Sequence, residues 1–113
     1  IKVGEAVITP TFTLSAKYVV HTVCPRYIDG RRDERELLAE AYRSALNFYD
    51  EVPNERSISF VSMGTVVYRW PLELAAEIAI KELALSKFEV TTMCVIDEAT
   101  RTIYQSACAK LEI

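Results

Sequence analysis

Glycine is scarce in this sequence: the 113 residues hold three, Gly4, Gly30 and Gly64, and no two are adjacent. The sequence therefore has no run of glycines of the kind that lets a backbone wrap closely around a ligand. Long apolar stretches are missing as well, and none approaches the length needed to span a bilayer. We predict no membrane partner.

Cysteine is also rare. Cys24, Cys94 and Cys108 are too few and too scattered for a metal site or a disulfide framework. Each lies in an apolar periodic run, where a free thiol behaves as a small hydrophobic group. We predict that all three are reduced and largely buried, in a cytoplasmic setting.

The sequence also lacks an excess of basic residues. Lys and Arg number 13 against 16 Asp and Glu, giving a net charge of −3, so we predict no nucleic-acid partner. Arg31 and Arg32 stand among acidic residues, which favours a solvated loop over an anion-binding patch. With 50% hydrophobic residues, the chain fits one globular domain over residues 1–113.

Strand-like and helix-like segments alternate along the chain. Strands are predicted at residues 6–9, 16–24, 57–63 and 89–96, and helices at 33–50, 71–86 and 99–111. This order predicts an α/β fold with a largely parallel sheet, in which ligands bind beyond the carboxyl ends of the strands. The loop after Met63 leads into a helix and could hold an anion, or could be a connector only.

Several residues suggest local roles. Asp33 and Glu36 have the spacing of a capping box, and Glu77 and Lys81 that of a helical ion pair. Residues 16–24 read as an interior strand buried on both faces, so His21 is interpreted as a satisfied core residue and not a catalyst. The other core candidates are aromatic residues of the first helix, Tyr42 and Tyr49.

Six segments, in order, resemble the macro domain. They are GEAVITP at 4–10, AKYVVHTVCP at 16–25, ELLAEAYRSAL at 36–46, SISF at 57–60, PLELAAEIA at 71–79 and CVIDE at 94–98. The resemblance implies a three-layer αβα fold with a mixed, largely parallel sheet. It implies ADP-ribose or a related nucleotide-diphosphate-ribose as the ligand, and no cofactor. Some members hydrolyse ADP-ribosyl esters or process ADP-ribose 1″-phosphate.

The family's N-terminal strands have no counterpart here, nor do its Asn-rich stretch and its Gly-rich loop. One of those strands lies, in the family, between the strands that resemble residues 16–24 and 57–63. Without it, the two neighbours must pair with each other or be completed by another chain. We expect an assembly, as a homo-oligomer or by association with the missing N-terminal segment.

The remaining phosphate loop is altered. Residues 61–71, VSMGTVVYRWP, resemble the family pattern P-A-x-S-T-G-x-Y-G-F-P, with Val66 and Arg69 in place of two glycines. A β-branched Val66 resists positive φ, while Arg69 could supply charge to a phosphate or be merely exposed. Ile96 stands where many members stack an aromatic ring on adenine. By resemblance, the ligand-binding positions are Gly64, Thr65, Val66, Val67, Tyr68 and Arg69, with Ile96 on the adenine side.

These substitutions predict weak or absent ADP-ribose binding. The sequence shows no Ser–His–acid set, no metal-ligand spacing and no paired carboxylates, so we expect no catalytic residue and no enzyme activity from this chain. The alternative hypothesis is a degenerate macro-type module that has a structural or protein-interaction role and binds no nucleotide.

Overall fold

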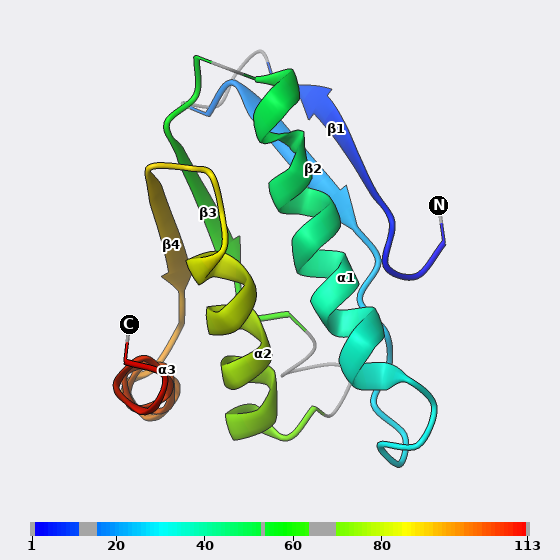
Figure 1. Ribbon diagram of the computed structural model, residues 1–113, viewed down its shortest axis with the longest axis vertical. Helices are drawn as coiled ribbons and strands as arrows, with labels where there is room; N and C mark the ends of the chain where they lie inside the picture. The colour runs from blue at the N-terminus through cyan, green and yellow to red at the C-terminus, as the bar shows by residue number, and fades with distance from the viewer. Residues whose placement is uncertain (1, 12–15, 53, 64–69, 113) are drawn as a thin grey trace.

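The computed structural model describes residues 2–11, 16–52, 54–63 and 70–112. The elements follow one another as β1 (Ala6–Pro10), β2 (Tyr18–Thr22), α1 (Glu34–Leu46), the 3-10 helix η1 (Asn47–Glu51), β3 (Ser57–Val61), α2 (Leu72–Ala84), β4 (Val90–Cys94) and α3 (Glu98–Lys110) (Figure 1). Each predicted helix and strand is present, and most ends differ from the predicted ends by one to three residues. The predicted helix at 33–50 is divided, because its last turn is the 3-10 helix η1.

The described strands form two separate two-stranded sheets. β1 pairs with β2 antiparallel, and β3 pairs with β4 parallel. β2, β3 and β4 run in the same general direction, and β1 runs against them (Figure 1). The chain therefore has the predicted α/β class with parallel pairing in β3–β4, and the two strands expected as neighbours of a missing strand have not closed up on each other.

A groove of about 1010 Å³ separates the two sheets. It lies between β2 and β3, and its apolar floor includes Ala45, Phe48 and Val52 from the end of α1 and from the segment that follows it. We call this space the β2–β3 groove.

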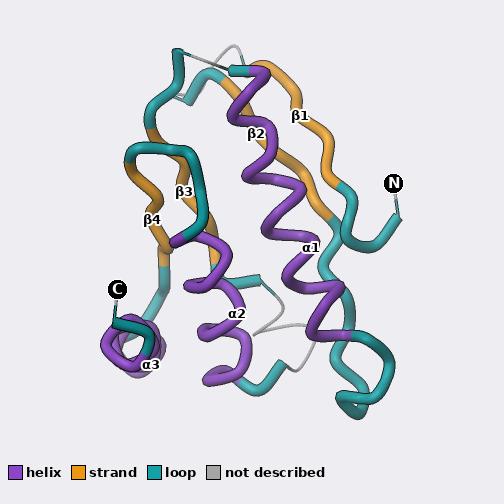
Figure 2. Tube along the Cα trace, in the orientation of Figure 1, coloured by secondary structure: helices purple, strands orange, loops and turns teal. Residues whose placement is uncertain are grey.

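The core lies between the helices and one face of the sheets (Figure 2). Tyr42 is 1% exposed and packs its ring on Phe60 of β3, with the ring centroids 5.3 Å apart. Tyr49 packs edge-on against Phe88 at 5.0 Å, so both tyrosines contribute to the core as predicted. Aromatic pairs of this kind add stability beyond the area that they bury.

The other face of the β3–β4 sheet is exposed. Side chains alternate along a strand, so Ile58 and Phe60 point into the core while Val61 is 70% exposed. Cys94 is exposed in the same way, which makes the prediction of burial wrong for this cysteine. Cys24 and Cys108 are half-buried, and all three are free thiols.

β2 is less buried than predicted. The expectation of burial on both faces is wrong, since its residues are at most half-buried and His21 is exposed. The imidazole Nε2 lies 3.0 Å from the hydroxyl of Thr9 across the β1–β2 pair. The apolar composition of β2 thus belongs to a strand with an open edge along the β2–β3 groove.

The predicted capping box at the start of α1 is also wrong. Asp33 has a φ of 58°, in the left-handed region, and its side chain makes no capping hydrogen bond. The carboxylate of Glu34 turns back and accepts hydrogen bonds from backbone N–H groups of the loop that precedes α1. These donors are Ile28, Asp29 and Arg32.

This loop is organised around Glu34, which is 3% exposed. The hydrogen bond from Ile28 N–H, with those from neighbouring amides, lowers the pKa of Glu34 to about 2. Gly30 turns the loop with a φ of 76°, in accordance with the predicted Asp29–Gly30 turn. A side chain at Gly30 would also press on the hydroxyl of Tyr27, 3.0 Å away.

We expect Glu34→Gln to lower the melting temperature at neutral pH and to make the melting temperature change less between neutral and acidic pH. Because the pKa of Glu34 is lower in the folded chain, its ionised carboxylate stabilises the fold. This contribution is fully present at a pH above 4.5, the ordinary pKa of a glutamate, and it is lost as the pH falls towards about 2. Thermal unfolding followed by circular dichroism between these pH values measures it. The matched control is Glu36→Gln, an exposed carboxylate on the same turn. An identical acid dependence in wild type and Glu34→Gln would contradict this role.

Candidate functional site

Three parallel strands end at one edge of the molecule. β2 leads into Cys24 and Pro25, β3 into Ser62 and Met63, and β4 into Ile96. Helix α2 also begins at this edge (Figure 1). Since ligands of α/β sheets bind beyond the carboxyl ends of the strands, this edge is the candidate site.

Most of the predicted site residues lie outside the described residues. Gly64, Thr65, Val66, Val67, Tyr68 and Arg69 belong to this group. The structure does place the two ends of their segment. Met63, at the first end, donates its backbone N–H to the hydroxyl of Tyr42 at 3.2 Å.

Trp70 fixes the second end. Its side chain is buried, 4% exposed, and its indole N–H donates to the carbonyl of Pro25 at 2.8 Å. The ring also packs on Tyr27, with the centroids 5.1 Å apart. Trp70 therefore joins the residues that follow β3 to those that follow β2. Sequence reasoning overlooked it, although a lone tryptophan directly before a helix-starting proline was a usable signal.

The first turn of α2 directs its backbone N–H groups towards this edge. Pro71 is the N-cap residue and provides no side-chain cap, and the first helical hydrogen bond runs from Ala75 N–H to the Pro71 carbonyl. The backbone N–H groups ahead of Ala75 are therefore oriented to receive an anion, and the helix dipole favours negative charge there. Glu73 is the one acidic residue in this turn and opposes that charge.

Ile96 lies at the same edge and is 90% exposed. It follows β4 and precedes Asp97, whose carboxylate caps α3 by accepting from Thr100 N–H at 2.8 Å. That hydrogen bond lowers the pKa of Asp97. The structure thus places Ile96 as an open apolar surface that a flat ring could cover by packing, without aromatic stacking.

A group of buried hydroxyls supports the site from below. Ser62 and Tyr104 place their hydroxyl oxygens 2.6 Å apart, and Tyr104 is also hydrogen-bonded to Tyr42. Burial raises the pKa of both tyrosines, so they stay neutral hydroxyls over the physiological range. They hold the end of β3 in place and are poorly suited to act as bases. No periodic pattern in the sequence indicates this cluster.

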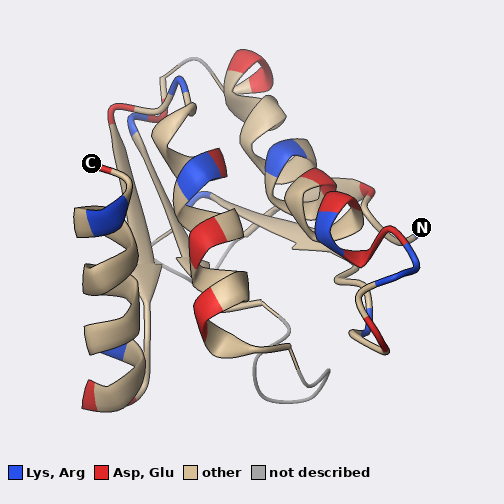
Figure 3. Ribbon diagram, turned by 60° about the horizontal axis from the view of Figure 1, so that its bottom comes forward, with Lys and Arg blue, Asp and Glu red and all other residues tan. Residues whose placement is uncertain are grey.

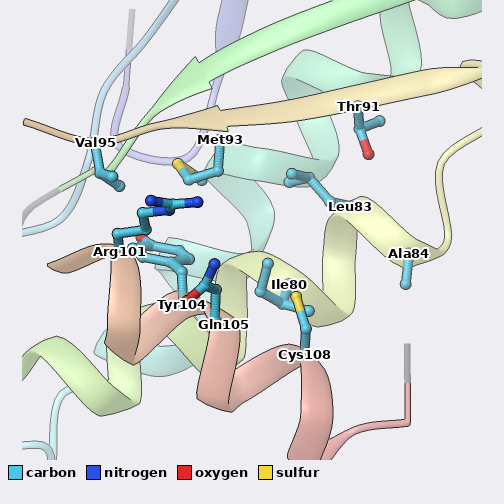
Figure 4. A pocket seen from close by; sticks show the side chains of 10 residues that line it. All are labelled: Ile80, Leu83, Ala84, Thr91, Met93, Val95, Arg101, Tyr104, Gln105 and Cys108. Carbon is cyan, nitrogen blue, oxygen red and sulfur yellow. The ribbon is translucent and has the colours of Figure 1, made fainter. Parts of the chain in front are cut away.

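A second hollow of about 350 Å³ lies between α2, β4 and α3. Figure 4 shows Arg101 reaching over Tyr104 towards Met93, with Ile80 and Leu83 to the right of them. Its lining is mostly apolar, and Arg101 itself pairs with Glu98 at 3.4 Å. This hollow is incompletely filled packing between elements.

In the part of the chain that the structure describes, no group of three His, Cys, Asp or Glu residues could hold a metal ion. Acidic and basic residues are interleaved along the helices and the loop before α1 (Figure 3). No described helix is both long enough and apolar enough to cross a bilayer.

The predicted Glu77–Lys81 pair is replaced by one between Glu77 and Lys110 of α3, at 2.5 Å.

The family model described as "Macro domain" matches residues 1–79 of this sequence. The chain belongs to the macro domain family. The resemblance inferred from the six segments is thereby confirmed.

Curated relatives agree with this assignment. A macro domain-containing protein of Lactiplantibacillus plantarum is 38% identical, over 96% of this chain and 66% of its own length. An O-acetyl-ADP-ribose deacetylase of Salmonella gallinarum is 42% identical, over 89% of this chain and 59% of its own length. The macro domain chain described here therefore spans less than two thirds of these relatives.

Solved macrodomains have the same fold. A mutant of the Oceanobacillus iheyensis macrodomain with ADPR matches with a TM-score of 0.90 and 31% identity, covering 99% of this chain and 62% of that one. A Trypanosoma brucei macrodomain in complex with ADP matches with a TM-score of 0.75 and 30% identity, covering 94% of this chain and 46% of that one.

Proposed function

We propose that this macro domain chain forms part of a site for ADP-ribose or a related nucleotide-diphosphate-ribose, and that the chain alone binds such a ligand weakly. The observation that carries the proposal is the convergence, at one edge, of the ends of β2, β3 and β4 with the N-terminal turn of α2. The backbone N–H groups of that turn suit a diphosphate, and the exposed Ile96 suits the flat face of a base. The O. iheyensis relative with ADPR supports the ligand class.

Two features weaken the site. Val66 and Arg69 replace glycines of the family pattern, so the backbone is less free to approach phosphate oxygens. The β2–β3 groove also interrupts the sheet between two of the strand ends that frame the site. A site with an unsupported centre loses the fixed geometry on which affinity depends.

The alternative function is a module for structural or protein-protein contact without nucleotide binding. The open groove favours it, because a strand edge that faces a gap can bind another polypeptide.

Calorimetry with ADP-ribose tests the proposal. We expect the chain to bind with a dissociation constant of about 1 mM or weaker, near −4 kcal/mol or less favourable. Val66→Gly combined with Arg69→Gly should tighten binding by about tenfold, since hydrogen bonds from amides to charged groups are worth about 1.5–3 kcal/mol each. The matched control is Val67→Gly, which loosens the same loop at a position where the family pattern has no glycine.

Each result decides between the functions. Micromolar binding by the unmodified chain would contradict the proposed weakness. No binding by the unmodified chain or by the double variant, with the fold intact by circular dichroism, would favour the module that binds no nucleotide.

A further inference from the structure

The hollow between α2, β4 and α3 is space that the side chains of these three elements leave unfilled, and its volume is about 350 Å³. Sites for small molecules usually have volumes of about 300–1,000 Å³. An apolar cavity of about 150 Å³ already has room for benzene. The hollow is therefore large enough for a small organic molecule with a ring or a short alkyl chain.

One part of the wall of the hollow is apolar. Ile80 and Leu83 of α2 are buried, and Met93 lines the same hollow from β4. The unbranched thioether side chain of Met93 can adapt its shape to a molecule that lies against it. Water finds few hydrogen-bond partners on such a wall. This part of the hollow therefore suits the hydrocarbon part of a ligand.

The other part of the wall is polar and positively charged. In Figure 4 the polar ends of Arg101 and Gln105 lie towards one side of the hollow, and Leu83 and Ala84 lie towards the other. Of the lining residues in the part of the chain that the structure describes, Arg101 alone is charged. A guanidinium binds a carboxylate through two parallel hydrogen bonds, and a side-chain amide can donate a third.

The present partner of Arg101 is a weak competitor for such a carboxylate. It is Glu98, which lies one turn earlier on α3 at 3.4 Å, and the two side chains are 59% and 84% exposed. An ion pair so open to water and salt contributes little to stability. A ligand that also buries apolar surface in the hollow can therefore displace the carboxylate of Glu98 from Arg101.

We propose that this hollow is a binding site for a small monocarboxylate with an apolar tail. The carboxylate binds Arg101 and Gln105, and the tail lies against Ile80, Leu83 and Met93. A cation is a poor occupant because it would meet the guanidinium, and a polyol is poor because its hydroxyls would stay unpaired on the apolar wall. The proposal does not depend on nucleotide binding at the strand ends.

Octanoate is the probe, and two other ligands are matched to it. Octanamide has the same tail without the charge, and acetate has the charge without the tail. Calorimetry on the full chain should show saturable binding of one octanoate per chain. Octanamide and acetate should each bind about tenfold more weakly or worse, because each lacks one of the two contacts.

The thiol of Cys108 lines the hollow and can report its occupancy. It is half-buried, whereas Cys94 is exposed on the face of β4 opposite to Met93. Octanoate at about ten times its dissociation constant should slow the labelling of Cys108 by a maleimide about tenfold, and labelling of Cys94 should not change. ADP-ribose should not protect Cys108, so this test is separate from that of the proposed nucleotide site.

Variants test the two contacts separately. Arg101→Gln should lower the affinity for octanoate to that for octanamide, and Arg101→Lys should keep part of the preference for the carboxylate. Ala84 is exposed at the end of α2, so Ala84→Phe should leave the fold intact, as circular dichroism can check, and should abolish binding by filling the mouth of the hollow. Leu85→Phe is the matched control, because Leu85 is exposed and does not line the hollow.

Four results would overturn the proposal. They are the absence of saturable octanoate binding, equal affinity for octanoate and octanamide, an unchanged affinity for octanoate in Arg101→Gln, and equal protection of Cys94 and Cys108. Protection of Cys108 by ADP-ribose as strong as that by octanoate would also contradict it, because the nucleotide would then occupy the hollow. If Ala84→Phe does not fold, the comparison of octanoate with octanamide in Arg101→Gln decides.

Discussion

Tyr42→Ala is expected to remove most of the stability of this chain. The side chain is 1% exposed, packs on Phe60, and accepts a hydrogen bond from Met63 N–H at 3.2 Å. Truncation of a buried aromatic residue costs about 3–5 kcal/mol, because the cavity that remains collapses only in part. Domains have about 5–15 kcal/mol in total, so the folded fraction should fall sharply. Urea denaturation followed by circular dichroism measures the loss.

Tyr42→Phe separates packing from hydrogen bonding. The ring stays on Phe60, while Met63 N–H loses its acceptor at the end of β3. We expect a loss of about 1–3 kcal/mol, the cost of an unsatisfied buried donor. A change below about 0.5 kcal/mol for Tyr42→Ala would contradict the central position of this residue, since changes that small are typical of surface sites.

Trp70→Ala is the second large effect that we expect. The indole is buried, packs on Tyr27, and donates to the Pro25 carbonyl. Its removal should cost about 3–5 kcal/mol. Because Trp70 joins the segments after β2 and β3, amide exchange at Arg26 and Tyr27 should also become faster. Unfolding must be followed by circular dichroism, as Trp70 is the single tryptophan of the chain.

Trp70→Phe is the matched control. It keeps an aromatic ring beside Tyr27 and deletes the donor to Pro25. A loss of about 1–3 kcal/mol, smaller than for Trp70→Ala, would assign the rest to packing. Equal effects of the two variants would show that the hydrogen bond alone joins the segments.

The order of elements and most of the core could be predicted from the sequence, because they depend on local periodicity. Tyr42 and Tyr49 follow the apolar stripe of α1, and the stripe alone places them inside. The boundaries of α2 and α3 follow from Pro71 and from the polar residues near Asp97. The family followed from short segments in a fixed order.

Features that depend on tertiary contacts were missed. β2 looks like a buried strand because it is apolar, but burial also needs a neighbour on each side, and composition does not reveal whether one is present. Asp33 has the spacing of a cap, yet its backbone is in the left-handed region and its side chain makes no capping hydrogen bond. At the site, the position of Ile96 was predicted from the sequence. The role of Trp70 was not, because it depends on a hydrogen bond to Pro25, which lies 45 residues away in the chain.

The division into two sheets has a consequence for folding. In a continuous sheet, the loss of one strand breaks the hydrogen bonds of its neighbours. Here no described hydrogen-bonded ladder joins β1–β2 to β3–β4. The two halves communicate mainly through the packing of α1 against α2 and through single links such as Arg43 to Glu82 at 3.1 Å. The two halves also share one hydrophobic core, in which Tyr42 of α1 packs on Phe60 of β3. Cooperative melting of the whole chain therefore depends on side-chain packing between the halves and not on a hydrogen-bonded ladder between them.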